Sequence, residues 1–271
     1  MKNENVCVLS DADFKRAVGV QRDIFDIMLE EIKKKIRDFG RPPKLSRADQ
    51  LLMTLMYWRE YRTEFHIGVS YGISESAVCR TIKKIEDALI KSEIFHLFGK
   101  NNILCRSDLR TVLIDASEQP VERPKKKSCG NYSGKKKCFT QKVQITADFE
   151  TGEILSSDFC SGRTHDFKLF KESGAALQPH VLILADAGYQ GIAKIHKNSR
   201  TPFKKKKNCR LSEEEKAENR KLSKKRIKVE HIFRKLKIFR ILREKYRNRR
   251  KRFSLRFNLI AACCNLAVRS V

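Results

Sequence analysis

Three acidic residues stand where metal-ligating carboxylates would be needed. Asp115 ends the apolar run 112–114, and Asp186 ends a second apolar run, 181–185. Glu230 lies within a stretch rich in Lys and Arg. Two strands that each end in an Asp, followed by a helix that carries a Glu, can bring three carboxylates to one edge of a sheet. Mg²⁺ prefers such oxygen ligands, so we expect a two-metal site for phosphoryl transfer on DNA.

The residues around Glu230 could hold a phosphate. Arg226 lies four residues before it and Lys237 seven residues after it, so at 100° per residue all three share one helical stripe. The neighbouring apolar face consists of Val229, Ile232, Phe233, Leu236 and Phe239. A surface Glu with basic neighbours explains this pattern equally well, and an Asp after a strand is often only a turn residue. The order of the three acids is what favours a metal site.

These acids need a sheet to position them, and the hydrophobic pattern changes from helical to strand-like near residue 111. We expect a helical lead-in over 1–40 and a helix-turn-helix domain over 41–100, with Ser46 and Ser74 as helix caps. We then expect strands at 111–115, 139–149, 153–160 and 181–186, a helix at 164–173, a loop and helix at 188–197, a short strand at 202–203 and mainly helix from Ser212. This order indicates an α/β domain over 105–271, a mixed sheet flanked by helices. Asp166 would be either a helix cap or a residue that supports the site.

A helix-turn-helix is indicated around Gly72. Gly68 lies four residues before it and the apolar Val78 six residues after it, which lets two helices cross closely. The second helix would present a polar face to a DNA major groove and its phosphates, made of Ser74, Glu75, Ser76, Arg80, Lys83 and Lys84. The alternative is an ordinary pair of helices packed on the catalytic domain.

The composition implies a polyanionic partner. The chain carries 59 Lys and Arg against 32 Asp and Glu, a formal net charge of +27, which far exceeds what solubility requires. Double-stranded DNA is the first candidate. We expect Lys135 and Lys136 to contact phosphates, together with the basic runs 204–207 and 247–252.

An acidic membrane surface is the rival partner, but two features disfavour it. No apolar run approaches the roughly 18–20 residues of a spanning helix, and the N-terminus has no signal-peptide core. Nine scattered cysteines without a C-x-x-C pair indicate free thiols in a reducing compartment, not a zinc ribbon. The apolar helix expected at 257–268 would then serve as core or as a dimer contact.

Five segments of the chain carry motif-like residues in order. They are Asp115-Ala116-Ser117-Glu118-Gln119-Pro120 with Arg123-Pro124, Tyr132-Ser133-Gly134-Lys135-Lys136-Lys137, Gly162-Arg163-Thr164-His165-Asp166, Leu184-Ala185-Asp186-Ala187-Gly188-Tyr189-Gln190-Gly191, and Arg226-x-x-x-Glu230 with Lys237. Over residues 45–268 the chain resembles the DDE-type transposases of bacterial insertion sequences, in the insertion-sequence-five group related to Harbinger elements. The resemblance implies a ribonuclease-H-like fold with Asp115, Asp186 and Glu230 as catalytic ligands of two Mg²⁺ ions, for which Mn²⁺ is expected to substitute.

The resemblance also implies an activity and its partners. The protein would bind the terminal inverted repeats of its insertion sequence, cleave the DNA ends and join them to target DNA. Arg226 and Lys237 would position the scissile phosphate. A homodimer or higher oligomer on DNA is implied, in the cytoplasm of a bacterium and associated with its nucleoid.

Two positions depart from the family's pattern. Ser223 stands where a Tyr is common, and Cys138-Phe139 where a His is common. Either change could weaken end cleavage without removing metal binding. The alternative functions are therefore a DNA-binding protein that has lost catalysis, or a related metal-dependent DNA nuclease without strand transfer.

Overall fold

A computed structural model describes residues 3–37, 42–99, 103–123, 132–174, 177–205 and 210–269. By its contacts the chain divides into two compact units. The helical unit comprises Met1–His96, Lys235–Lys245 and Lys251–Val271, and the sheet unit comprises Leu97–Arg234 and Tyr246–Arg250. The domain limits 1–40, 41–100 and 105–271 stay a prediction, and the contacts group the C-terminal segments with the N-terminal helices.

Short polar caps define the helices of the helical unit. These helices are α1 (Asn3–Cys7), α2 (Asp11–Val18), α3 (Arg22–Lys35), α4 (Arg47–Glu60), α5 (Glu64–Tyr71), α6 (Glu75–Ile90) and α10 (Phe253–Arg269). The side chains of Ser46, Thr63 and Ser74 each accept a hydrogen bond from the backbone N–H three residues on, which satisfies a donor left free by the helix start. The predicted caps Ser46 and Ser74 are confirmed.

Helix α4 forms the centre of the helical unit. It is buried around most of its circumference, and α2, α3, α5 and α6 all pack against it, as expected for a helix that is apolar on nearly every side. Helix α10 packs against α3 and α6. The C-terminal helix is thus part of this core, which is one of the two roles predicted for it.

A buried ion cluster joins α4, α6 and the start of α10. Glu86 is fully buried and accepts hydrogen bonds from Trp58 Nε1 at 3.1 Å, Arg252 Nε at 2.6 Å and Arg256 Nε at 2.6 Å. Arg256 is itself only 1% exposed. Asp87 binds the second nitrogen, Nη2, of Arg252 at 2.7 Å. The carboxylate of Glu86 therefore balances a guanidinium that has no access to water.

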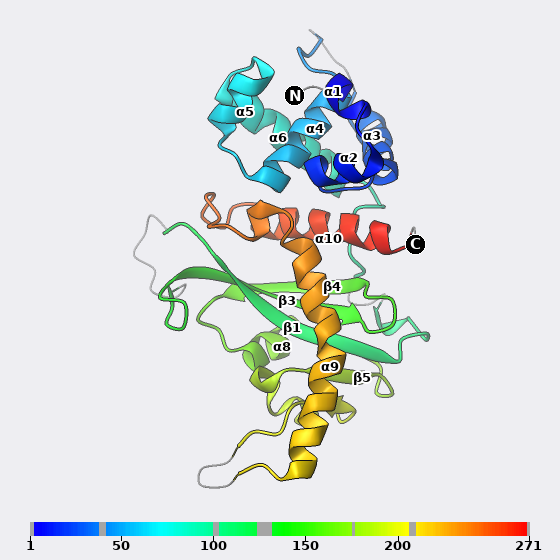
Figure 1. The fold of residues 1–271 in the computed structure, drawn as a ribbon, viewed down its shortest axis with the longest axis vertical. Helices are drawn as coiled ribbons and strands as arrows, with labels where there is room; N and C mark the ends of the chain where they lie inside the picture. Colours follow the sequence, from blue (N-terminus) through cyan, green and yellow to red (C-terminus); the bar gives the residue numbers. More distant parts are fainter. Residues whose placement is uncertain are drawn as a thin grey trace. The chain divides into compact units, whose positions relative to one another are not determined.

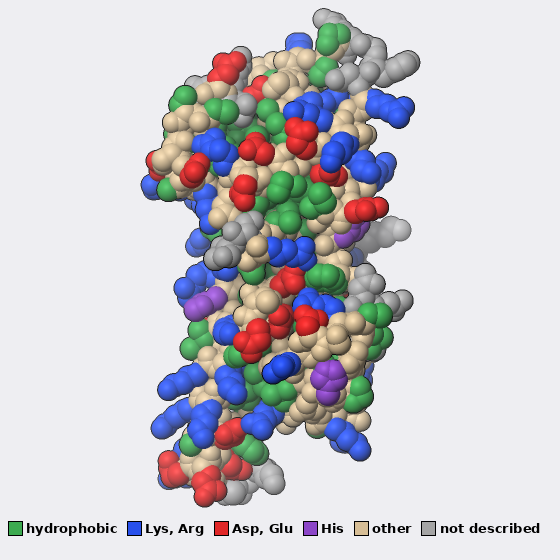
Figure 2. All heavy atoms as spheres, turned by 90° about the vertical axis from the view of Figure 1, so that its right-hand side faces the viewer, with side chains coloured by type: hydrophobic (Ala, Val, Ile, Leu, Met, Phe, Trp, Pro, Cys, Tyr) green, Lys and Arg blue, Asp and Glu red, His purple; other side chains and the backbone are tan. Residues whose placement is uncertain are grey.

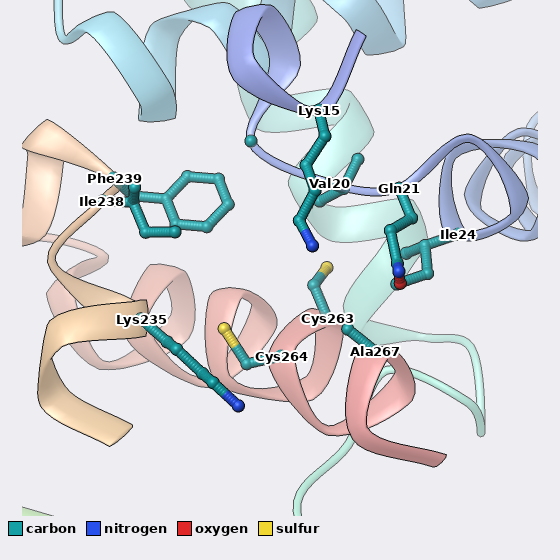
Figure 3. A pocket seen from close by; sticks show the side chains of 11 residues that line it. Lys15, Val20, Gln21, Ile24, Lys235, Ile238, Phe239, Cys263, Cys264 and Ala267 are labelled. Carbon is teal, nitrogen blue, oxygen red and sulfur yellow. The ribbon is translucent and has the colours of Figure 1, made fainter. Parts of the chain in front are cut away.

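The cysteines that the structure describes are free thiols, as predicted. Two of them, Cys263 and Cys264, line a cavity of about 220 Å³ in the helical unit, together with Lys15 and Lys235 (Figure 3). Burial raises the pKa of the Cys264 thiol to about 12, although the two lysine charges act in the opposite direction. Thiols that stay protonated are poor metal ligands and poor nucleophiles, so these residues serve packing.

The sheet unit is a mixed sheet with helices packed on it (Figure 1). Its elements are β1 (Thr111–Pro120), β2 (Tyr132–Ser133), β3 (Cys138–Asp148), β4 (Ile154–Ser161), α8 (Asp166–Ser173), β5 (Leu182–Ala185), β6 (Ser199–Arg200) and α9 (Glu213–Leu236), whose last two residues belong to the helical unit. The strand order is β2-β3-β1-β5-β6, with β4 also paired to β3. Strands β1, β3 and β4 pair antiparallel, whereas β1, β5 and β6 pair parallel. The predicted α/β class with a mixed sheet after a helical N-terminal region is confirmed.

Three details of the sheet unit differ from the prediction. Strand β1 runs five residues beyond Asp115, because residues 116–120 continue to pair with β3. The short strand lies at Ser199–Arg200 and not at 202–203, since Pro202 has no N–H to donate to a ladder. The helix expected within 188–197 is two 3₁₀ turns, Ala187–Tyr189 and Ile192–Lys194, separated by Gly191 at φ +96°, a conformation that ends regular helix.

The apolar core of the sheet unit lies on one face of β1 and β5. Val112 and Ile114 of β1 pack there with Ile183 and Ala185 of β5, covered by Phe170 of α8 among others. Among the described residues, no helix has both the length and the apolar character needed to cross a bilayer.

Candidate functional site

Parallel pairing of β1 and β5 brings two aspartates together. Ile114 lies opposite Ala185, and one step on, the same register brings Asp115 beside Asp186. Side chains alternate between the two faces of a strand. The side chains of both aspartates therefore lie on the same face of the sheet. This face is opposite to the one on which Ile114 and Ala185 contact the apolar core.

Backbone hydrogen bonds orient both carboxylates. Asp115 Oδ1 accepts from the N–H of Ala116 at 2.9 Å, and Asp186 Oδ1 accepts from the N–H of Gly188 at 2.7 Å. Both side chains are partly buried. Each carboxylate thus accepts a backbone hydrogen bond through one oxygen. In the part of the chain that the structure describes, its second oxygen has no protein hydrogen-bond donor.

Gly188 provides the space between Asp186 and Asp166. A β-carbon at this position would lie 2.5 Å from Asp166 Oδ2 and 2.9 Å from Asp186 Oδ1. Both distances are too short for any side chain, so only glycine lets the two carboxylates approach its α-carbon from two sides. These short distances explain why the residue two positions after Asp186 is a glycine.

Helix α9 supplies a cation to the same site. Arg226 Nη2 lies 3.5 Å from Asp115 Oδ1, and both side chains are less than one-fifth exposed. The predicted apolar face of α9 is confirmed, because Val229, Ile232, Phe233 and Leu236 are buried. Glu230 is exposed, one turn or about 6 Å along the axis from Arg226.

The electrostatics of the aspartates reflect their burial. The pKa of Asp115 is raised to about 6, mainly by burial and to a smaller extent by the charges of Asp186 and Asp166, against the lowering effects of Arg226 and the Ala116 N–H. The pKa of the buried Tyr189 phenol is raised by burial and then by the charges of the same three aspartates. The three acids therefore act on one neighbourhood, where a cation would relieve their repulsion.

Asp166 is held by a lysine inside the sheet. His165 is the N-cap of α8, so Asp166 is not the cap that was one of its two predicted roles. Lys142 of β3, only 6% exposed, donates to Asp166 Oδ1 at 2.7 Å and to the carbonyl of Thr164 at 2.6 Å. Its Nζ also lies 3.8 Å from Glu118 Oε1. Lys142 was not among the site residues predicted from the sequence, although its alternation with the polar Gln144 and Thr146 marks a polar strand face.

This donor set suits a divalent cation of the magnesium type. All donors are carboxylate oxygens, which hard cations prefer over sulfur or imidazole. As the side chains stand, the described residues contain no group of three or more His, Cys, Asp or Glu that could hold a metal. Asp115 and Asp186 are the two predicted ligands that the parallel strands bring together.

Helices α5 and α6 approach each other as closely as the predicted helix-turn-helix requires. Gly72 ends α5 at φ +67°, and a β-carbon on Gly68 would lie 2.6 Å from the carbonyl oxygen of Ile73. Val78 is fully buried. The residues predicted to face DNA are exposed along α6, namely Ser74, Glu75, Ser76, Arg80, Lys83 and Lys84.

The remaining predicted DNA contacts are spread over the chain. Lys135 and Lys136 are exposed in the turn between β2 and β3, and Lys237 follows α9 in the helical unit. Part of the predicted basic run 204–207 lies outside the described residues. Figure 2 shows Lys and Arg side chains over the whole visible face, with smaller groups of Asp and Glu between them.

Two protein-family models match this chain. One, described as "DDE superfamily endonuclease", matches residues 114–267, and the other, "Helix-turn-helix of DDE superfamily endonuclease", matches residues 43–92. Both ranges fall on the parts described above, the first beginning at the strand that carries Asp115.

Similar proteins come from two bacteria. "Probable transposase for insertion sequence element IS702" of Microchaete diplosiphon is 48% identical over 269 residues, which is 98% of each chain. A protein named as a transposase for insertion sequence element IS112 of Streptomyces albus G is 27% identical over 208 residues, 76% of this chain and 74% of that one.

Two solved structures are also similar. They are "Mos1 transposase paired-end complex with left transposon end", with TM-score 0.21, 11% identity and 61% of each chain covered, and "Crystal structure of a pre-cleavage Mos1 transpososome", with TM-score 0.23, 11% identity and 76% and 80% covered.

Proposed function

The chain belongs to the DDE superfamily of metal-dependent DNA endonucleases and transposases, and from this premise we propose its reaction. It binds the terminal inverted repeats of its own insertion sequence, cleaves the DNA at the element ends and joins them to target DNA. The observation that carries the proposal is the pair Asp115 and Asp186 at neighbouring parallel strands, with Arg226 3.5 Å from Asp115. The family predicted from the sequence is confirmed, and its insertion-sequence-five group stays a prediction.

Three carboxylates are the proposed ligands of two Mg²⁺ ions. Asp115 and Asp186 are fixed by backbone N–H groups, and Glu230, exposed one turn from Arg226, completes the set by rotation of its side chain. Bound there, the ions would activate a water and stabilise the leaving oxygen. Mn²⁺ has similar ligand preferences and is expected to replace Mg²⁺.

Arg226 has two successive partners in this proposal. It lies 3.5 Å from Asp115, and its planar fork of donors can bind a phosphate bidentately. We assign it to the scissile phosphate, whose charge increases as the reaction proceeds. Lys237 is proposed to contact the same strand.

The genetic context of the reaction is proposed from the relatives. Both are named as transposases of insertion sequences, and the first aligns with this chain over nearly the full length of each. Because two element ends must be joined to one target, we propose that the protein works as a homodimer or higher oligomer on DNA.

Cleavage of a labelled duplex that carries the element ends, in Mg²⁺, tests the proposal. We expect the wild-type protein to cut at the ends and form joined products. Asp115→Asn should abolish cutting and leave DNA affinity unchanged. The matched control is Glu214→Gln, which removes an exposed acid from the first turn of α9.

Other outcomes identify the alternatives. Cutting by Asp115→Asn at the wild-type rate refutes the assignment of the site. End-specific binding without cutting, in both Mg²⁺ and Mn²⁺, indicates a DNA-binding protein that has lost catalysis. Cutting without joined products indicates a nuclease.

A further inference from the structure

A basic hollow lies between α3 and α6 in the helical unit. It has a volume of about 520 Å³ and is lined by six cations, Lys35, Arg37, Arg80, Lys83, Lys84 and Lys91, and by the single acid Asp87. Ile36 and Ala88, both buried, form its apolar floor. Lys35 and Arg37 come from the end of α3 and the residues after it, outside the range 43–92 that matches the helix-turn-helix family model.

The charge of this hollow is not balanced within the described part of the chain. Asp87 is engaged by Arg252 at 2.7 Å, and none of the six cations is in an ion pair with another described residue. Neighbouring lysines on α3 differ, because Lys33 pairs with Glu30 at 2.8 Å and Lys34 with Glu31 at 2.7 Å. All six side chains belong to exposed residues. The six charges thus face water and one another.

Opposing effects are too small to cancel this charge. The C-terminal ends of α3 and α6 each contribute about half a negative charge, against six positive ones. Arg80 and Lys84 are four residues apart on one helix, a spacing at which like charges repel and destabilise the helix. A polyanion that enters the hollow would convert this repulsion into attraction.

We propose that this hollow holds the DNA phosphate backbone, so that α3 forms a second wall of the DNA interface beside α6. The inference rests on the proposed function, in that it takes DNA as the partner. It extends the interface to helix α3, where the sequence carried no resemblance. Lys35 and Arg37 are then phosphate contacts, which position the duplex and carry no sequence information.

The salt dependence of binding tests the proposal. Each phosphate contact contributes about 0.9 to the slope of log K against log salt. We expect Lys35→Ala to lower the slope by about 0.9 and to weaken binding roughly 8-fold at about 0.1 M salt. Lys35→Ala/Arg37→Ala should lower the slope by about 1.8 and weaken binding roughly 60-fold. Binding is measured by fluorescence anisotropy with the full-length protein over a salt series.

The matched control is Lys33→Ala, two residues from Lys35 on the same helix and already paired with Glu30. It should change the affinity less than 2-fold, and the exchange Lys35→Arg/Arg37→Lys should keep the wild-type slope. The preference for element ends over random DNA should not change in any variant. Equal slopes for Lys35→Ala and Lys33→Ala overturn the inference.

The slope can be measured on any duplex, so this result is separate from that of the proposed function. A wild type that shows no preference for element ends contradicts the proposed function, and the slopes still decide the role of α3.

Discussion

The buried cluster around Glu86 makes the helical unit sensitive to the loss of one charge. Glu86→Gln keeps the shape of the side chain and removes its charge. Arg252 retains Asp87 as a partner at 2.7 Å, whereas Arg256, 1% exposed, loses the charge of the carboxylate that its Nε contacts at 2.6 Å. Removing one partner of a buried ion pair costs about 3–5 kcal/mol, because the remaining charge stays out of water.

This cost can be converted into a shift that is easily measured. With a dependence on urea of about 2 kcal/mol per molar, a loss of about 4 kcal/mol lowers the unfolding midpoint by about 2 M. Trp58 is the only tryptophan of the chain, and its Nε1 donates to Glu86. Its fluorescence therefore reports unfolding of the helical unit without a contribution from the sheet unit.

Two variants complete the experiment. Glu30→Gln breaks an exposed ion pair on α3 and should cost less than about 1 kcal/mol. Glu86→Leu/Arg256→Met should be more stable than Glu86→Leu alone, because the buried guanidinium is removed together with the carboxylate that contacts it. A midpoint for Glu86→Gln equal to that of Glu30→Gln would refute the reasoning, as would a double variant no more stable than Glu86→Leu.

Three further predictions concern the sheet unit. Gly188→Ala should lower the cleavage rate about 100-fold, since a displacement near 1 Å at a reacting centre can cost that much; Gly134→Ala, where a β-carbon meets nothing within 4 Å, is the control. Lys142→Met removes the lysine that contacts Asp166 at 2.7 Å. It should lower the free energy of unfolding by about 1–3 kcal/mol and lower the cleavage rate, while DNA affinity stays the same. Urea melts, cleavage assays and binding assays measure these three quantities. Because the pKa of Asp115 is about 6, Mg²⁺ affinity should fall up to tenfold per pH unit below 6, and Asp115→Asn should remove this dependence in titrations at pH 5 and 7.

Local signals were sufficient to predict the elements that carry the aspartates. The apolar runs before Asp115 and Asp186 predicted β1 and β5, and their shared edge followed from the rule that parallel strands end together. Ser46 and Ser74 predicted two helix starts, since each is a short polar residue before an apolar helix. These features depend only on residues within a few positions of one another.

Other features depend on contacts that are distant in the sequence. Strand β1 continues past Asp115 because β3 offers a partner for each residue up to Pro120, which local alternation around residue 115 does not reveal. Lys142 finds Asp166 only through the packing of α8 on the sheet. The grouping of α10 with the N-terminal helices depends on Glu86 meeting Arg256, 170 positions further along the chain.

The burial of Asp115 links stability to metal binding. A pKa of about 6, compared with 3.8 for an ordinary aspartate, means that burial and its neighbours disfavour the ionised form by about 3 kcal/mol. The folded pKa is the higher one, so protonation stabilises the sheet unit as pH falls from about 6 towards 4. At pH 7 the carboxylate is mostly ionised, and this cost remains although the 3.5 Å contact with Arg226 acts to lower the pKa. A divalent cation between Asp115 and Asp186 would offset more of it, and the release of Asp115 would leave Arg226 available for a phosphate. If Asp115 and Asp186 hold the metal as proposed, the burial that disfavours an ionised Asp115 would therefore favour the binding of a cation beside it.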